Sequence, residues 1–293
     1  MGAAVRLTVF VIWTLIMVGP YSAMMILRGG YRKFGQVYWR GVSRICRMQI
    51  KVTGELATER PLLVVSNHNS YLDIIVLNTL IPGVFVAKSE VAGWPGFGIL
   101  ARLARTVFVD RKRSSVARNA EEIKSRMAEG DPLILFPEGT SNDGNRVLPF
   151  KTALFAVASM PVSIKGAPEA LPVVQPVSVA FTKVDGIPMG RLWRPLYAWY
   201  GDMDLAGHLW EMLRFGVVTV EVRFHPVRDP ATFASRKALA DQCYQDVSTG
   251  VASSLTGREI APTPLLPPPG AEAPALTAPP SPTPILQGEG AGS

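Results

Sequence analysis

The first pattern along the chain is a long run without charge. Residues 7–27 contain no charged side chain, and this length is about the ~20 residues that a helix needs to cross the hydrocarbon core of a bilayer. A cleaved signal peptide is disfavoured, because cleavage after Ala23 would put bulky Tyr21 where a small residue is required. We therefore expect an uncleaved membrane helix. Gly19-Pro20 could kink it, so an oblique insertion that does not span the membrane stays open.

An amphipathic pattern follows this apolar run. Residues 31–48 place aromatic and aliphatic side chains at helical spacing and put arginines and a lysine between them. The apolar positions are Tyr31, Phe34, Tyr38, Val42 and Ile45. Such a composition suits a helix that lies in the headgroup plane of a membrane. The alternative is a helix that packs on a globular core. We take residues 1–48 as a membrane anchor followed by an interfacial helix.

From residue 49 onward, short apolar runs alternate with helical patterns. The predicted strands are 49–55, 61–67, 83–88, 106–110, 132–137, 173–181 and 217–224, and the predicted helices lie near 70–80, 96–104, 114–129, 151–159, 205–215 and 232–256. Strands rich in Val and Ile with little alternation are typical of a sheet that is covered on both faces. We therefore predict an α/β domain over 49–258, with a mixed, mostly parallel sheet flanked by helices. The strand at 217–224 alternates cleanly, which suggests an edge position.

Composition indicates where this domain ends and which partners it favours. Residues 259–293 are rich in Pro and Ala and nearly uncharged, which predicts a disordered tail. The net charge is +7, and the basic residues concentrate beside the membrane segment. That position favours an anionic lipid surface over nucleic acid, and the positive-inside rule places the domain on the cytoplasmic face of the inner (plasma) membrane. Cys46 and Cys243 have no metal-ligand spacing, and no metal site is predicted.

Candidate chemistry begins where the second strand ends, at Ser66-Asn67-His68-Asn69-Ser70-Tyr71-Leu72-Asp73. A histidine can act as a general base, and a carboxylate on its far nitrogen fixes the tautomer. Residues five apart on a helix do not face each other, so His68 must precede the helix, with Asp73 in its first turn. A capping box from Ser70 to Asp73 explains the carboxylate equally well without any chemistry.

Two more clusters follow later strands. Phe136-Pro137-Glu138-Gly139-Thr140 leaves the apolar run at 132–137, and a turn accounts for its Pro and Gly but not for its carboxylate. Two polar strand ends raise the case for an active site. Around the strand at 106–110 stand Arg105, Arg111, Lys112 and Arg113. They could hold a phosphate or carboxylate, although a solvated run of charge is the alternative.

Together these motifs resemble the glycerolipid acyltransferase family, which contains the 1-acyl-glycerol-3-phosphate acyltransferases. Four family blocks occur in order: H-x4-D at His68–Asp73, a block similar to G-x-x-F-I-x-R at Arg105–Arg111, F-P-E-G-T at Phe136–Thr140, and an apolar run ending in Pro at 173–177. Phe150-Lys151 resembles the F-K pair that follows the third block. The resemblance covers roughly residues 1–225.

The resemblance implies an activity and a role for each residue. His68 would deprotonate the free hydroxyl of a lysolipid, and Asp73 would orient the imidazole. The acyl donor would be a thioester of coenzyme A or of acyl carrier protein, which would then be a partner, and no cofactor or metal would be needed. The acceptor pocket would be shaped by Glu138, Gly139 and Thr140. The anionic head group would be held by Arg111 together with Lys151.

One departure from the family pattern bears on the acceptor. The family commonly has Arg directly after E-G-T, and this chain has Ser141-Asn142-Asp143-Gly144. We expect acylation of 1-acyl-glycerol-3-phosphate to phosphatidic acid. The alternative is a lyso-ornithine lipid, because Lys88-Ser89-Glu90-Val91, Trp94-Pro95 and the segment after E-G-T also resemble lyso-ornithine lipid acyltransferases. From another class, a non-catalytic lipid-binding protein stays open, with His68 and Asp73 only a capped helix start.

Overall fold

A mixed sheet forms the centre of the computed structural model, which describes residues 2–27, 29–94, 96–110 and 115–261. Among these residues the strands are β1 (Met48–Thr53), β2 (Leu62–Ser66), β3 (Val84–Lys88), β4 (Val107–Val109), β5 (Leu133–Leu135), β6 (Val173–Val184), β7 (Ile187–Pro188) and β8 (Val218–Phe224). Their order is β1-β8-β6-β2-β5-β3-β4, with β7 beside β6. In the part described, β6 pairs antiparallel with β8 and β7, and the other pairs are parallel. The predicted fold class is confirmed.

The edge position expected for residues 217–224 is wrong. The strand β8 lies between β1 and β6, and β1 takes the edge instead. Val218, Val220 and Val222 are buried, whereas Glu221 and Arg223 are partly exposed. The alternation of apolar and polar residues in β8 therefore reflects that one face of this strand is less covered than the other. It carries no information on how many neighbours the strand has.

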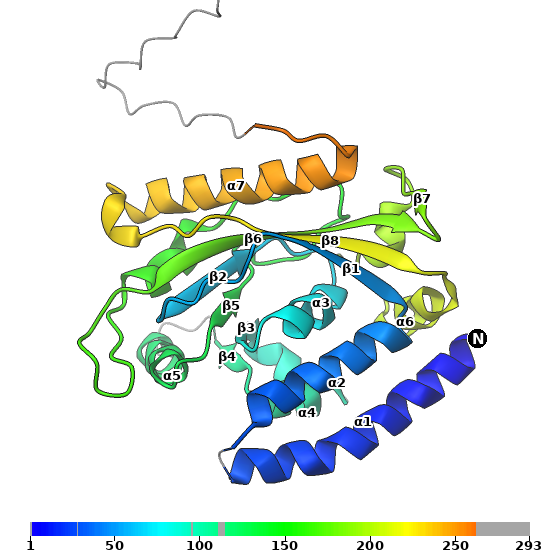
Figure 1. The fold of residues 1–293 in the computed structure, drawn as a ribbon, viewed down its shortest axis with the longest axis horizontal. Helices are drawn as coiled ribbons and strands as arrows, with labels where there is room; N and C mark the ends of the chain where they lie inside the picture. Colours follow the sequence, from blue (N-terminus) through cyan, green and yellow to red (C-terminus); the bar gives the residue numbers. More distant parts are fainter. Residues whose placement is uncertain (1, 28, 95, 111–114, 262–293) are drawn as a thin grey trace, which may run out of the picture. The chain divides into compact units, whose positions relative to one another are not determined.

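Apolar side chains from the two faces of the sheet enter two separate cores. On β2, Leu62 and Val64 belong to one core, and Leu63 and Val65 belong to the other. The first core receives side chains from α3 (Leu72–Leu80) and α6 (Leu205–Arg214), and the second from α5 (Val116–Ala128) and α7 (Arg236–Thr256). In Figure 1 the helix α7 runs along one face of the sheet, and α3 lies across the other. The strands therefore lack alternation because the sheet is covered on both faces, as the sequence predicts.

The two N-terminal helices form a hairpin that packs on the domain. The helix α1 (Ala3–Ile26) is long and apolar enough to cross a membrane, and α2 (Tyr31–Ile45) returns beside it in the opposite direction (Figure 1). The indole Nε1 of Trp13 donates to the carbonyl of Tyr38 at 3.1 Å. A Cβ atom on Gly41 would lie 2.3 Å from the Trp13 ring. Gly41 therefore permits the close approach of the two helices.

The helix α2 also packs on α3. Its Val42 and Ser43 are buried, whereas Lys33, Arg40 and Arg44 are exposed. The helix thus contacts the core as the alternative interpretation expected, and it keeps a basic outer face. Residues up to 261 fall in one compact unit, so the predicted boundary after residue 48 separates segments that pack together. The predicted tail lies outside the described residues from 262 onward.

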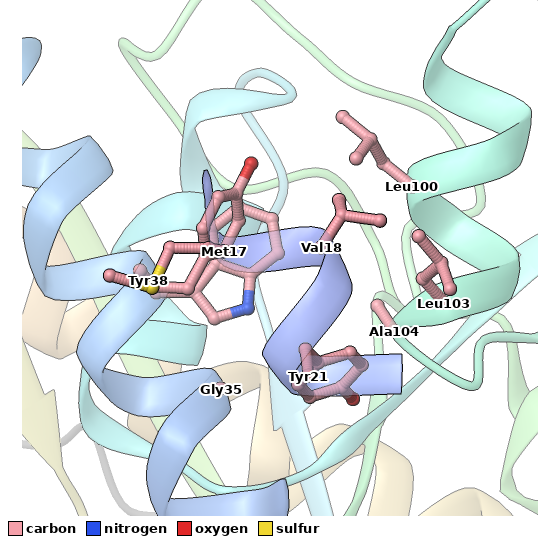
Figure 2. A pocket seen from close by; sticks show the side chains of 9 residues that line it. Met17, Val18, Tyr21, Gly35, Tyr38, Leu100, Leu103 and Ala104 are labelled. Carbon is pink, nitrogen blue, oxygen red and sulfur yellow. The ribbon is translucent and has the colours of Figure 1, made fainter. Parts of the chain in front are cut away.

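An apolar pocket lies where α1, α2 and α4 (Phe97–Leu103) meet (Figure 2). It is lined by Met17, Val18, Tyr21, Gly35, Tyr38, Trp39, Leu100, Leu103 and Ala104. Among the described residues that line it none is charged, and neither His68 nor Asp73 takes part. The pocket therefore lies between the N-terminal hairpin and α4, away from the predicted catalytic residues.

Candidate active site

The loop after β2 brings His68 and Asp73 into contact. His68 stands two residues beyond the end of β2, and Asp73 is the second residue of α3. The Nδ1 atom of His68 lies 2.9 Å from the Oδ2 atom of Asp73. This is the geometry that the spacing of the two residues predicts, with the histidine before the helix and the carboxylate in its first turn.

The same carboxylate oxygen also binds the backbone of the loop that precedes α3. The Oδ2 atom of Asp73 accepts the backbone N–H of Asn69 at 2.6 Å and that of Ser70 at 2.9 Å. The Asp73 side chain is completely buried, and its negative charge is favoured by the positive end of the helix dipole. The contacts with the loop backbone and with His68 therefore coexist in one carboxylate. The backbone bonds hold this carboxylate behind the imidazole.

The imidazole of His68 uses Nδ1 for the contact with Asp73 and leaves Nε2 for a substrate. Its ring stacks on Phe136, with centroids 4.0 Å apart and planes 12° apart. The side chain keeps 22% of its surface exposed. Because Nδ1–H donates to Asp73, Nε2 is the unprotonated nitrogen in the neutral ring. That nitrogen can take a proton from a substrate.

Glu138 ties the two predicted strand ends together. Its Oε1 atom accepts the backbone N–H of His68 at 2.8 Å. Its Oε2 atom accepts the side chain of Asn142 at 2.7 Å and the backbone N–H of Leu148 at 2.9 Å. Burial raises the pKa of the Glu138 carboxyl to about 7, although these hydrogen bonds act to lower it. Both oxygens thus hold the protein's own loops, and the predicted contact of Glu138 with an acceptor stays a prediction.

The other predicted residues of this strand end lie nearer the surface. Gly139 has φ of +67°, and a Cβ atom there would lie 2.7 Å from Nζ of Lys151. A side chain at this position would thus be strained and would displace the lysine. The Thr140 side chain is exposed. Arg111 lies outside the described residues, so its predicted role as an anion ligand stays a prediction.

Two asparagines complete the loop structure, and the sequence analysis assigned them no individual role. Asn142 donates to the carbonyl of His68 from both its backbone N and its Nδ2, each at 3.2 Å. Asn67 exchanges two hydrogen bonds of 2.8 Å with the backbone of Val179 on β6. Both amides satisfy backbone groups at strand ends, where the ladder stops. An asparagine within two residues of a motif at a strand end is the signal that could have identified them.

Of the basic residues predicted around the strand at 106–110, only Arg105 is among the residues that the structure describes, since residues 111–113 lie outside them. This residue stands where the family commonly has Gly, and its φ of +61° is the backbone conformation that Gly adopts most easily. Its guanidinium donates to Asp131 and to the Tyr31 hydroxyl, both at 2.6 Å, and also to Glu129. Arg105 therefore fastens α2 to the domain.

The remaining histidines have local partners. Nδ1 of His208 lies 3.0 Å from the hydroxyl of Tyr71, and Nε2 of His225 lies 3.1 Å from that of Ser178. Burial lowers the pKa of His225 to about 4. Within the described part of the chain, no cluster of three or more His, Cys, Asp or Glu side chains could hold a metal ion.

Comparison with known proteins identifies the family. Residues 49–179 match the family model described as Acyltransferase. The chain is 44% identical over 241 residues to a lyso-ornithine lipid O-acyltransferase from Brucella abortus, covering 82% of this chain and 90% of that protein. It is 32% identical over 219 residues to a 1-acyl-sn-glycerol-3-phosphate acyltransferase from Neisseria meningitidis, covering 73% and 78%.

A solved structure agrees on the fold. It is the 1-acyl-sn-glycerophosphate acyltransferase PlsC from Thermotoga maritima, with a TM-score of 0.56 at 22% identity over 86% of this chain and 98% of that chain. The resemblance found in the motifs is thus confirmed over most of the sequence. The chain belongs to the glycerolipid acyltransferase family and is an O-acyltransferase.

Proposed function

We propose that the protein transfers an acyl chain from a thioester to the free hydroxyl of a lyso-ornithine lipid. The observation that carries the chemistry is the 2.9 Å contact between Nδ1 of His68 and the buried carboxylate of Asp73, with the other ring nitrogen left for substrate. The acceptor is supported by the 44% identity to a lyso-ornithine lipid O-acyltransferase across 90% of its length.

The dyad supplies general-base catalysis. Nε2 of His68 takes the proton of the acceptor hydroxyl while the oxygen attacks the thioester carbonyl carbon. The C–O ester bond forms, the C–S bond breaks, and the imidazolium returns the proton to the departing thiolate. Asp73 stabilises the imidazolium between these events. No acyl-enzyme forms on this route.

The surrounding residues position the reactants. Glu138 acts as a positioning residue, because it holds the His68 backbone from behind. Gly139 and Thr140 shape the acceptor pocket, and Lys151 with Arg111 attracts its anionic group. Backbone N–H groups at the strand ends meet the developing oxyanion. The reaction needs no metal or cofactor beyond the thioester co-substrate, which is acyl-CoA or acyl-acyl carrier protein.

The acceptor is a membrane lipid, so the site must work at a membrane surface. The helix α1 supplies the apolar segment for this contact, and the exposed basic face of α2 suits anionic headgroups. We place the domain on the cytoplasmic face, where the thioester donors are. Membership of an O-acyltransferase family gives no support to a non-catalytic lipid-binding protein.

The second candidate acceptor is 1-acylglycerol-3-phosphate. The 32% identity to the Neisseria meningitidis enzyme favours it, and it is the acceptor expected from the motifs alone. Against it, Ser141 replaces the Arg that the family commonly uses next to E-G-T. A neutral hydroxyl there removes one charge that a phosphate would bind.

Membranes that contain the wild-type protein would be supplied with radiolabelled acyl-CoA or acyl-acyl carrier protein and with each acceptor in turn. We expect labelled ornithine lipid at a higher kcat/KM than labelled phosphatidic acid. The His68→Ala protein at equal abundance is the control and should form neither product. Labelled phosphatidic acid alone would contradict the proposed acceptor.

A further inference from the structure

The segment 191–194 packs against the loop that follows Glu138. Arg194 donates from NH1 to the side-chain oxygen of Asn145 at 3.0 Å, and Asn145 donates to the carbonyl of Arg191 at 3.1 Å. A Cβ atom on Gly144 would lie 4.0 Å from Cβ of Arg194. Arg194 is thus fixed to the loop that stands where the family commonly carries an arginine.

This loop in turn contacts the catalytic strand end. Asn142 bonds the carbonyl of His68, and a Cβ atom on Gly144 would lie 4.0 Å from the side chain of Asn69, the residue after His68. The carbonyl of Asn69 accepts the backbone N–H of Trp199 at 2.9 Å. Residues 191–199 therefore contact the loop after Glu138 through Arg191 and Arg194, and the loop after β2 through Trp199.

Charges of both signs meet at this place. Burial and the nearby Arg191 lower the pKa of Arg194, and Asp143 acts to raise it. Burial acts to raise the pKa of Asp143, but the hydrogen bonds from Asn145 and the nearby Arg146 and Arg191 outweigh it and the pKa is lowered. The cluster thus combines three guanidinium groups with one carboxylate.

The Arg194 guanidinium is only partly used by the protein. Its NH1 has Asn145 as a partner, and its Nε, which is buried, has no hydrogen-bond partner among the residues that the structure describes. Arg105, by contrast, donates to three side chains. A half-buried arginine beside an active site, with Asn145 as its one hydrogen-bond partner among the described residues, suits an anionic ligand group, since a guanidinium binds carboxylates in a bidentate manner.

On this basis we propose that Arg194 binds the carboxylate of the acceptor's amino-acid head group, and that Asp143 binds its side-chain amine. This inference rests on the proposed function, because an ornithine head group carries both of these charges. A basic side chain on the segment 191–194 and an acidic side chain on the neighbouring loop match such a zwitterion. A phosphate acceptor would gain nothing from Asp143, so the same pair disfavours it.

The test uses the wild-type protein in membranes with three acceptors: the lyso-ornithine lipid, its methyl ester, and an analogue with a norvaline head group that lacks the side-chain amine. We expect each analogue to raise the KM for the acceptor about tenfold or more, because each removes a hydrogen bond to a charged group. The KM for the thioester donor should stay unchanged. Equal KM values for all three acceptors would overturn the inference.

Two variants test whether Arg194 and Asp143 cause the raised KM values. In Arg194→Ala the methyl ester should no longer be penalised against the parent lipid, and in Asp143→Asn the norvaline analogue should no longer be penalised. Arg214→Ala is the matched control, because this exposed guanidinium pairs with Glu211 on the same helix, and it should keep both penalties. Unchanged penalties in the two test variants would overturn the assignment.

The experiment also distinguishes failure of the proposed function from failure of the head-group assignment. A wild-type protein that acylates no lyso-ornithine lipid would overturn the proposed function, and this inference with it. A wild-type protein that acylates all three acceptors equally would overturn the inference alone. The analogues act on the wild-type protein, so the result does not depend on whether either variant folds.

Discussion

The His68–Asp73 pair and the Arg105–Asp131 pair each join a basic side chain to a carboxylate with almost no exposed surface. They differ in how completely the basic group is used. Arg105 donates to Asp131, to Glu129 and to the Tyr31 hydroxyl. His68 gives one nitrogen to Asp73 and keeps the other at a partly exposed face.

This difference separates a structural ion cluster from a reactive one. Buried charges must be paired to be tolerated, so pairing by itself says nothing of function. What marks a reactive centre is a group that is held firmly on one side and remains open on the other. By this criterion His68 belongs to the chemistry, and Arg105 belongs to the packing of α2 on the domain.

The largest expected effect tests the reactive side of the comparison. His68→Ala should lower kcat by about 10²–10⁴-fold, the usual contribution of a positioned general base. It should change the free energy of unfolding less than a substitution of Arg105 does. His225→Gln is the control, since its Nε2 faces the Ser178 hydroxyl, and its turnover per folded molecule should equal that of the wild type. An active His68→Ala protein would remove the basis of the comparison.

A second prediction tests the structural side. Arg105→Ala should lower the free energy of unfolding by about 3 kcal/mol, because it leaves the buried Asp131 with one cation fewer. Turnover per folded molecule should stay unchanged. Arg105→Gly should be about 1 kcal/mol less destabilising than Arg105→Ala, since the residue has φ of +61°. Chemical denaturation of the solubilised protein measures both. Lost turnover with unchanged stability would show that Arg105 serves substrate.

A third prediction concerns the pH dependence of the link between the two strand ends. Burial raises the pKa of Glu138 from 4.5 to about 7. Between these values the folded protein keeps a proton that the unfolded chain has released. The free energy of unfolding therefore falls as pH rises through this window, by about 1.4 kcal/mol per pH unit from this group. Stabilisation from this proton is complete below pH 4.5 and is lost above pH 7.

Glu138→Gln removes this titration. Its free energy of unfolding should depend less on pH between 4.5 and 7 than that of the wild type, as measured by thermal unfolding across that range. The exposed Glu211 gives a matched control, since Glu211→Gln should keep the wild-type dependence. An equal dependence in wild type and Glu138→Gln would show that Glu138 does not titrate in this window.

Most of the sheet could be predicted from the sequence, because its strands are apolar runs bounded by turn residues. The strand β7 was missed, since Ile187–Pro188 is too short to give any periodic signal. The predicted helix at 151–159 is a 3₁₀ helix at Thr152–Ser159. Apolar spacing alone does not separate these two helix types at this length.

In the candidate site, local contacts could be predicted from the sequence and contacts between distant residues could not. The spacing of His68 and Asp73 is local, so the turn before α3 decides their contact and the sequence could reveal it. The contact between Asn145 and Arg194 joins residues 49 positions apart. It depends on how the segment after β7 returns to the loop, and no local pattern encodes that return. Residues that act through such distant contacts needed the structure.

The claim that His68 and Asp73 act as one unit has a direct test in kcat values for His68→Ala, Asp73→Asn and the double variant. Asp73→Asn alone should lower kcat by about 10²-fold or more, because the amide no longer favours the productive tautomer. In the double variant we expect a loss equal to that of His68→Ala alone, since residues that act as a unit are not additive. Losses that multiply in the double variant would contradict the dyad.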